Sequence, residues 1–252
     1  MTPVKAMILA GGILDNSFKL HGENVVNKAF IDIKGRLMME YVIDALRGAS
    51  LVEEIVLLTH TEIVPEKIRE FVTLVNSGEN ILETVINGLS YIPPDTLKVL
   101  LVMADLPLLT SEGVDDFLSR CNGRDGEYYY SILSQKDLEK GLPGFNHTYV
   151  KLKDGVFCGG GLILLDPGIC NEYRLNLMNK MIQVRKNPLE MAKILGAKTL
   201  FKIVSGQATR EDLEKRTSEV FKCKAISIIT PYIEIGINID KPEELDLIRS
   251  SG

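Results

Sequence analysis

Two carboxylates at the ends of apolar runs are the first residues of this sequence that could do chemistry. Asp105 ends the most apolar run, in VLLVMADLPLL, and Asp240 ends a β-patterned run, in GINIDKPEEL. A carboxylate at the end of a buried strand is costly without a partner, and Mg²⁺ takes one or two carboxylates together with substrate phosphates. We therefore predict that both aspartates hold one cation, with Asn238 as the alternative to Asp240. The structural alternatives are a turn or capping role for Asp105 and a helix N-cap for Asp240.

A glycine pair and a lysine supply the second set of candidates. Ala10-Gly11-Gly12 follows the first apolar run, and Lys28 lies between a polar loop and an apolar run. Glycines let backbone N–H groups approach a base or a phosphate without a Cβ in the way. The chain has neither GxxxxGK[ST] nor GxGxxG. A glycine turn also serves structure alone, and a single lysine is usually solvated, so neither feature is decisive by itself.

Alternating strand and helix patterns must position these residues. Short apolar runs predict strands at 4–9, 54–59, 72–75 and 97–103. Apolar residues at helical spacing predict helices at 36–47, 79–89 and 111–120, the last one capped by Ser111. This alternation predicts an α/β fold with a parallel sheet and right-handed crossovers. Ligands of such sheets bind outside the carboxyl ends of the strands, where the glycine pair and both aspartates fall.

The second half of the chain is less regular. Its patterns predict strands at 128–133, 149–152, 162–165, 225–229 and 233–239, the third preceded by Gly159-Gly160-Gly161. Residues 172–208 read as mostly helix, broken at Pro188 and Gly196, and a further helix begins after Lys241-Pro242. We expect one domain over 1–252, with a helical insertion at 172–220.

The segment 172–208 is basic, whereas the rest of the chain is acidic. It holds Arg174, Lys180, Arg185, Lys186, Lys193, Lys198 and Lys202 against Glu172 and Glu190, which makes it +5 in a chain of net charge −5. A solvated helical face explains this charge. The alternative is a docking surface for a phosphorylated or lipid-linked acceptor, or a peripheral contact with an anionic membrane, helped by Leu200, Phe201, Ile203 and Val204.

Composition excludes several classes of protein. A chain of 252 residues with 45% apolar and 25% charged residues is ordinary globular material, and its net charge of −5 makes nucleic acid an unexpected partner. No apolar run reaches eighteen residues, and the first one is too short for a secretory signal. The four cysteines and three histidines form neither a CxxC nor an HExxH pattern, so we expect reduced thiols in a cytoplasmic protein.

Six segments together resemble the nucleotidyltransferase superfamily, in the MobA-like NTP transferase branch that contains molybdenum cofactor guanylyltransferase and methylerythritol phosphate cytidylyltransferase. They are LAGG at 9–12, NKAFIDIKGRLMMEYVIDAL at 27–46, EEIVLLT at 53–59, SGENILETVINGLS at 77–90, VLLVMADLPLLT at 99–110 and GINIDKPEEL at 236–245. The resemblance covers 4–120 well, 236–250 fairly and 121–235 loosely. It implies a glycosyltransferase-A-like, Rossmann-related fold with three α/β/α layers around a mostly parallel sheet.

The resemblance also implies roles for individual residues. The nucleotide-binding set would be Leu9, Ala10, Gly11, Gly12, Lys19, Lys28, Ser77, Gly78 and Asn80. Asp105 and Asp240 would hold Mg²⁺, and Lys28 and Asp105 would be catalytic. Gly159, Gly160 and Gly161 would lie near the acceptor. The implied reaction moves a nucleoside monophosphate from an NTP to a phosphorylated small molecule and releases pyrophosphate.

One departure from the family pattern leaves other functions open. The family usually places an arginine in the loop after its glycines, but residues 13–27 contain none, and Lys19 is the only other basic candidate. Lysine binds phosphate as a point charge and lacks the bidentate fork of arginine. The alternatives are an inactive nucleotide-binding protein on the same fold and a metal-dependent glycosyltransferase. The sequence disfavours the second, because ADLP supplies one carboxylate where a DxD would be expected.

Overall fold

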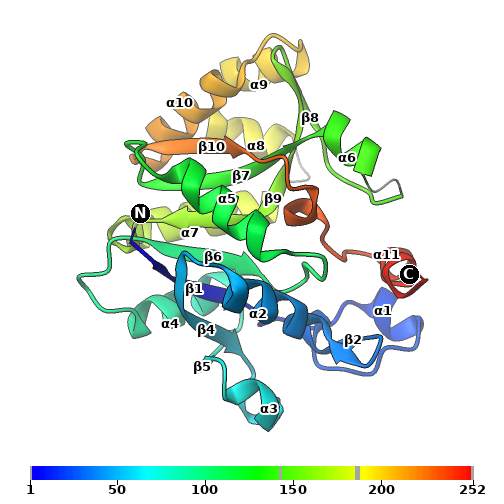
Figure 1. The fold of residues 1–252 in the computed structure, drawn as a ribbon. Coiled ribbons are helices and arrows are strands. Elements are labelled where there is room, and N and C mark those ends of the chain that lie inside the picture. The colour runs from blue at the N-terminus through cyan, green and yellow to red at the C-terminus, as the bar shows by residue number, and fades with distance from the viewer. Residues whose placement is uncertain (1, 142–143, 185–187, 251–252) are drawn as a thin grey trace.

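A central sheet organises the fold in the computed structural model, which describes residues 2–141, 144–184 and 188–250 (Figure 1). Within these residues the sheet has eight strands, in the order β10-β7-β9-β6-β1-β4-β5, with β8 paired to β9. Its strands are β1 Val4–Leu9, β4 Val52–Thr59, β5 Thr73–Asn76, β6 Val99–Met103, β7 Tyr128–Ser134, β8 Val150–Leu152, β9 Gly155–Leu165 and β10 Ala225–Ile229. A separate small hairpin joins β2 Asp32–Ile33 to β3 Arg36–Leu37.

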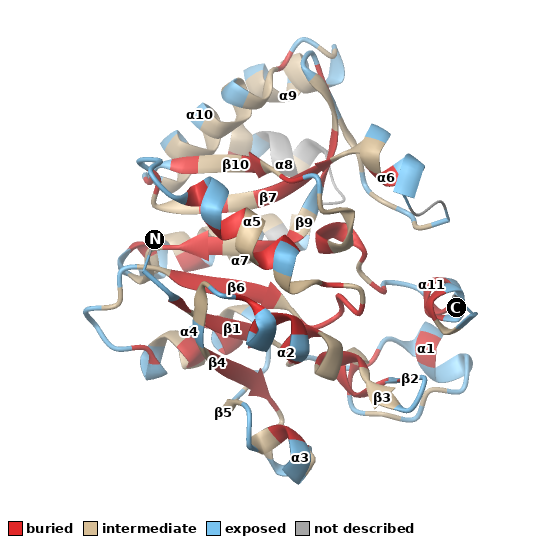
Figure 2. Cartoon of the chain, in the orientation of Figure 1, coloured by how far each residue is buried: buried red, intermediate tan, exposed pale blue. Residues whose placement is uncertain are grey.

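The sheet is mostly parallel, as the sequence predicts. β6, β1, β4 and β5 run parallel to one another, and β10 runs parallel to β7. β9 is antiparallel to both β6 and β7, so β6 and β7 point the same way and end at the same edge of the sheet. The central strands are mostly apolar because helices cover both of their faces (Figure 2).

Helices form a layer on each face of the sheet. α2 Met38–Gly48 and α5 Ser111–Cys121 pack on one face, and α4 Ile81–Tyr91 and α7 Glu172–Val184 pack on the other. The remaining α-helices are α1 Asn16–Leu20, α3 Glu66–Arg69, α6 Gln135–Gly141, α8 Pro188–Leu195, α9 Ala197–Val204, α10 Arg210–Phe221 and α11 Pro242–Ser250. Short 3₁₀ helices lie at η1 Lys28–Phe30, η2 Thr61–Ile63, η3 Pro167–Ile169 and η4 Ile233–Gly236. The resulting α/β/α arrangement confirms the predicted fold class.

The predicted strand at 233–239 is wrong. Residues 233–236 form η4, and the following residues cross the carboxyl end of the sheet, where the N–H of Ile239 donates to the carbonyl of Asp105 at 3.1 Å. Ile235, Ile237 and Ile239 are all buried in that crossing segment. The alternating isoleucines are therefore buried here, although the segment that contains them is not a β-strand.

Two smaller predictions also need correction. The helix α5 is capped by Thr110 and not by Ser111, because the Thr110 hydroxyl accepts from the N–H of Gly113 at 3.1 Å. Gly159, Gly160 and Gly161 lie inside β9 and do not precede a strand. A Cβ at Gly161 would come 2.6 Å from the side chain of Leu106, so the strand needs a glycine there to pack against the segment after β6.

The segment 172–208 is helical, as predicted, with α7, α8 and α9 separated near Pro188 and at Gly196. Its basic residues Arg185 and Lys186 lie outside the described residues. Phe201 and Val204 on α9 are 72% and 77% exposed, whereas Ile203 packs against the apolar cluster beneath the helix. None of the described helices combines the length and the apolar composition needed to cross a bilayer. A membrane or acceptor contact through this segment stays a prediction.

Candidate functional site

Lys28, Asp105 and Asp240 meet at the carboxyl edge of the sheet. The Nζ of Lys28 donates to Oδ2 of Asp105, to Oδ1 of Asp240 at 3.0 Å and to the carbonyl of Ile239 at 2.8 Å. Lys28 opens η1, Asp105 follows β6, and Asp240 precedes α11. Three segments that are far apart in the sequence therefore converge on one ammonium group.

Asp105 is the buried member of this group, with 6% of its surface exposed. Besides Lys28, its carboxylate accepts from Nδ2 of Asn238 at 2.9 Å on Oδ1. A buried carboxylate needs such partners to offset its lost hydration. Burial alone would lower the pKa of Lys28, but the charges of Asp105 and Asp240 outweigh it and raise that pKa above 10.5. Lys28 is therefore a permanent cation at neutral pH.

A buried glutamate holds the loop that carries Asp240. Oε2 of Glu244 accepts from the backbone N–H groups of Asp240 at 2.8 Å and Lys241 at 3.0 Å. Its Oε1 accepts from the N–H of Asn146 at 3.3 Å, in the segment before β8. Asp240 itself keeps an exposed carboxylate. Glu244 thus fixes the backbone of Asp240 and leaves its side chain accessible to a ligand.

The glycine turn after β1 packs against the segment before α4. The carbonyl of Ala10 accepts from Nδ2 of Asn27 at 2.9 Å and from the hydroxyl of Thr59 at 3.0 Å. A Cβ at Gly11 would come 2.5 Å from Cβ of Ser77, and Gly12 has a φ of +113°. Only glycine at position 11 allows this close approach of the two backbones.

The segment Ser77 to Asn80 has its own fixed geometry. The N–H of Gly78 donates to the hydroxyl of Thr84 at 3.0 Å, and Oδ1 of Asn80 caps α4 by accepting from the N–H of Glu83 at 3.0 Å. A helix N-terminus beside a glycine turn presents backbone N–H groups and a positive dipole end, both of which favour phosphate. The structure therefore brings together the glycines and the 77–80 segment, as the resemblance predicts.

The other predicted residues do not join this group. Lys19 is exposed on α1 and makes no ion pair within the described residues. The N-cap of α1 is Asp15, whose pKa is lowered by hydrogen bonds from Ser17 and further by the charge of Lys28, so α1 begins near the site. Gly159 and Gly160 pack against side chains of β7, Tyr130 for Gly159 and Ser131 and Leu133 for Gly160.

Four residues of the site escape sequence reasoning: Asn27, Thr59, His147 and Glu244. Asn27 and Thr59 hold the turn carbonyl, and Glu244 holds the Asp240 loop. Nε2 of His147 is buried and has no hydrogen-bond partner among the residues that the structure describes, and the charges of Glu244 and Asp240 both act on its ring. Asn27 could have been found from the sequence, because it is a polar residue directly before Lys28. The others are recognisable only through contacts between distant segments.

The donor chemistry of the site fits a hard cation. Asp105 and Asp240 supply carboxylate oxygens on either side of one positive charge, and Mg²⁺ prefers such oxygens and keeps water or phosphate as its other ligands. Within the described residues no group of three or more histidine, cysteine or acidic side chains forms a protein-only metal cage. A cation here would thus depend on phosphate oxygens as well.

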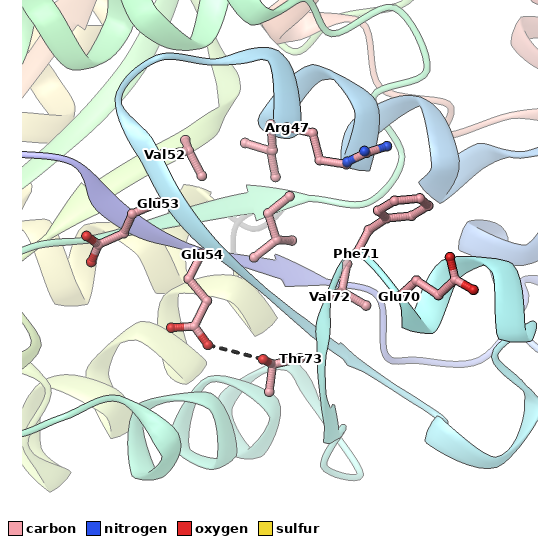
Figure 3. Close-up of a pocket in the computed structure, with 10 residues that line it drawn as sticks. Arg47, Val52, Glu53, Glu54, Glu70, Phe71, Val72 and Thr73 are labelled. Atoms are coloured by element: carbon pink, nitrogen blue, oxygen red, sulfur yellow. Dashed lines mark hydrogen bonds between the residues drawn. The ribbon is translucent and has the colours of Figure 1, made fainter.

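A separate cavity of about 430 Å³ lies at the far edge of the sheet, between the end of α2 and β5 (Figure 3). The guanidinium of Arg47 stacks on Phe71 at 3.6 Å from the ring centre. Glu53, Glu54 and Glu70 surround the same space. Three carboxylates would repel phosphate groups, so this cavity does not suit a nucleotide.

Comparisons with known proteins find a matching family and solved structures with the same fold. Residues 6–139 match the family described as MobA-like NTP transferase domain. A hypothetical transferase from Thermus thermophilus is 28% identical over 97% of this chain and 100% of that one, with a TM-score of 0.83. Among the curated proteins none matches this sequence.

Two more distant solved structures share the fold. A 4-diphosphocytidyl-2C-methyl-D-erythritol synthase from Anaerococcus prevotii is 15% identical, over 99% of this chain and 95% of its own, with a TM-score of 0.59. A nucleotidyl transferase from Methanothermobacter thermautotrophicus is 15% identical, over 98% of this chain and 96% of its own, with a TM-score of 0.55.

Proposed function

Because the chain belongs to the family of MobA-like NTP transferase domains, which match it over residues 6–139, we propose that it moves a nucleoside monophosphate from an NTP to a phosphorylated small molecule. The family makes it a nucleotidyltransferase. The acceptor class, the use of Mg²⁺ and the roles of single residues are parts of the proposal.

The nucleotide binds over the glycine turn in this proposal. Backbone N–H groups of Gly11 and Gly12 face the base and phosphates, and the 77–80 segment closes over them. The tight contact between Gly11 and Ser77 supports this placement, because it brings the glycine turn to the N-terminus of α4. Lys19, at the edge of the site, can add a point charge to the triphosphate.

The chemistry is nucleotidyl transfer at the α-phosphorus. A phosphate oxygen of the acceptor attacks that phosphorus, the bond to the bridging oxygen breaks, and pyrophosphate leaves with the electron pair. Positioning and charge neutralisation supply most of the rate in such reactions. Bound Mg²⁺, held by Asp105 and Asp240, would neutralise phosphate charge. Lys28, fixed as a cation by the same carboxylates, stabilises charge on the α-phosphate or the leaving group.

The single observation that carries the proposal is the convergence of Lys28, Asp105 and Asp240 beside the glycine turn. It combines one phosphate-binding cation with two potential metal ligands at the edge where open α/β sheets bind ligands.

The test is a thermal-shift screen of CTP, GTP, ATP and UTP with and without Mg²⁺. A ligand that binds the folded state raises Tm by mass action, so we expect one NTP to stabilise the protein more strongly with Mg²⁺. Asp105→Asn should lose the Mg²⁺-dependent part of the shift, whereas Asp95→Asn, at an exposed position, should keep it. No shift with any NTP in the wild-type protein would contradict the proposal.

A second candidate is nucleotide binding without turnover. The loop 13–27 contains no arginine, and Lys19 is solvent-exposed, so the triphosphate lacks a bidentate contact from that loop. Pyrophosphate release with the stabilising NTP and a panel of phosphorylated acceptors separates the two functions. Binding with no release for any acceptor would favour this second candidate.

A further inference from the structure

A cavity of about 240 Å³ lies between α10 and the sheet and shares no lining residue with the Lys28 site. From the helix, Arg210, Leu213, Glu214 and Thr217 line it at a spacing that places them on one face. From the sheet it is lined by Tyr128, Tyr130 and Ile132, which are alternate residues of β7 and therefore face the same side of the strand. The walls are therefore mainly aromatic and aliphatic.

One polar atom at this cavity lacks a hydrogen-bond partner. Nε of Arg210 is buried, makes no hydrogen bond within the described part of the chain and lies 3.8 Å from a carboxylate oxygen of Asp154, beyond hydrogen-bond distance. Burial raises the pKa of the phenols of Tyr128 and Tyr130, which line the same cavity and therefore stay neutral donors. A buried donor without an acceptor costs about 1–3 kcal/mol. The cavity thus combines an apolar wall with one buried donor that makes no hydrogen bond.

A glycine makes room for one of these donors. An added Cβ at Gly159 would overlap the hydroxyl of Tyr130, the first atom it would meet. Gly159 also lines the cavity. The tyrosine hydroxyl consequently lies over a strand position without a side chain.

The charge around Arg210 indicates what kind of ligand fits. Its guanidinium lies 3.8 Å from a carboxylate oxygen of Asp154 and 3.9 Å from one of Glu214, so its positive charge is already balanced. Glu214 also accepts from the N–H of Ser227 at 2.9 Å, which holds its carboxylate at the wall. An anionic ligand would meet two carboxylates against one guanidinium, and it would be repelled.

We propose that this cavity binds a small neutral molecule with an apolar body and one hydrogen-bond-accepting oxygen. The volume exceeds the roughly 150 Å³ of an engineered cavity that binds benzene, so a ring with a few further atoms fits. The oxygen accepts from Nε of Arg210 or from a tyrosine hydroxyl, and the body packs on β7 and Leu213. This ligand is distinct from the nucleotide.

Three matched probes test the proposal in the whole protein by NMR titration. Acetophenone carries a ring and a carbonyl oxygen, α-methylstyrene replaces that oxygen with a CH₂ group of the same shape, and benzoate adds a negative charge. We expect saturable binding of acetophenone, binding of α-methylstyrene that is roughly tenfold weaker, and benzoate weaker still.

Variants locate the site and the hydrogen bond. Ala225→Leu and Thr217→Leu each fill the cavity from opposite walls, and each should abolish binding of acetophenone. Arg210→Met should weaken the binding of acetophenone roughly tenfold and leave the binding of α-methylstyrene unchanged. Unchanged binding of α-methylstyrene also shows that the cavity is intact in this variant. Using both filling variants guards against one that fails to fold, and NTP-induced thermal shifts check that the other site is unaffected.

Three outcomes would overturn the proposal. The first is the absence of saturable acetophenone binding to the wild-type protein. The second is binding that persists in a folded cavity-filling variant. The third is benzoate binding more tightly than acetophenone, because it would make the site anion-selective. None of these depends on whether the protein transfers nucleotides.

Discussion

The ammonium group of Lys28 is shared between two carboxylates with very different exposure. Asp105 is buried and Asp240 is exposed, so Lys28 connects the interior of the protein with the open side of the site. A lysine in this position has two roles that experiments can separate. It compensates a buried charge, and it presents a cation to a phosphate.

The first role predicts a loss of stability in Lys28→Met. Removing one partner of a buried ion pair leaves an uncompensated charge, which costs about 3 kcal/mol in the free energy of unfolding. Adding Asp105→Asn to this variant removes that charge, so the double variant should regain at least about 1 kcal/mol. Urea unfolding measures all three proteins. Equal stability of Lys28→Met and wild type would show that the pair is not energetically coupled.

The proposed metal-binding role of Asp105 predicts the effect of Asp105→Ala on the reaction. Losing one preorganised electrostatic group typically costs about 10²–10³ in rate, and we expect at least that loss in pyrophosphate release. Asp95→Ala provides the control at an exposed position. Full activity of Asp105→Ala with NTP and Mg²⁺ would exclude Asp105 as the metal ligand.

His147 predicts a pH dependence of stability. Burial lowers its pKa below 6.5, although Glu244 and Asp240 act in the opposite direction. The unfolded chain therefore takes up a proton at a higher pH than the folded one, and this contribution to stability is lost as pH falls below about 6.5. We expect His147→Asn to lose less stability than wild type between pH 7 and pH 5. If Tm falls with pH to the same extent in the two proteins, this prediction is contradicted.

At the scale of elements, the site depends on one close contact between the glycine turn and the start of α4. Gly11→Ala places a Cβ 2.5 Å from Cβ of Ser77, too close for either backbone to stay in place. We expect this variant to lose NTP-induced stabilisation while it stays folded. Ser77→Gly removes the opposing Cβ, so Gly11→Ala with Ser77→Gly should recover much of the shift. No loss in the single variant would mean that the contact does not shape the nucleotide site.

Local patterns predict the elements of the first half well. The apolar runs that end before Gly11 and Asp105 are strands β1 and β6, and the periodicity of 36–47 and 111–120 corresponds to α2 and α5. The β-pattern argument places Asp105 at the carboxyl edge of the sheet, but it does not account for Asp240, because residues 233–239 form no strand and reach Asp105 by crossing that edge. Arguments of this kind succeed where the residues of a single segment determine its secondary structure.

Contacts between distant segments set the limit of this reasoning. The isoleucines of 233–239 predict a strand, but their burial comes from crossing the end of the sheet. To predict that Lys28 contacts Asp105, one must know where η1 lies relative to β6, and no periodicity in the sequence reveals that. The same holds for Glu244, which contacts a backbone N–H 98 residues away in the chain, and for the cavity under α10.

At the scale of the whole molecule, the sheet separates two places where ligands fit. The carboxyl edge of β1 and β6 holds the Lys28 site, and the α10 face of β7 and β10 holds the apolar cavity. β9 joins these regions, because it pairs with both β6 and β7.

The whole fold also determines how the four cysteines react. None of them forms a disulfide, and burial raises their pKa values, to about 12 for Cys121 and about 11 for Cys158 and Cys170. Cys223 is buried as well, and its pKa is raised for the same reason. The thiolate is the reactive form, and its fraction at pH 8 falls about tenfold for each unit by which the pKa rises.

We therefore expect iodoacetamide to label the native protein at pH 8 at least about 100-fold more slowly than the urea-unfolded chain, in which all four thiols react. Cys170, the least buried of the four, should label first, and Cys170→Ser should remove that earliest step. Because no disulfide stabilises the fold, a reducing agent should leave Tm unchanged. Rapid labelling of two or more thiols in the native state would show that α7 and the end of α10, which share an apolar cluster with Cys170 and Cys223, open far more readily than their packing implies.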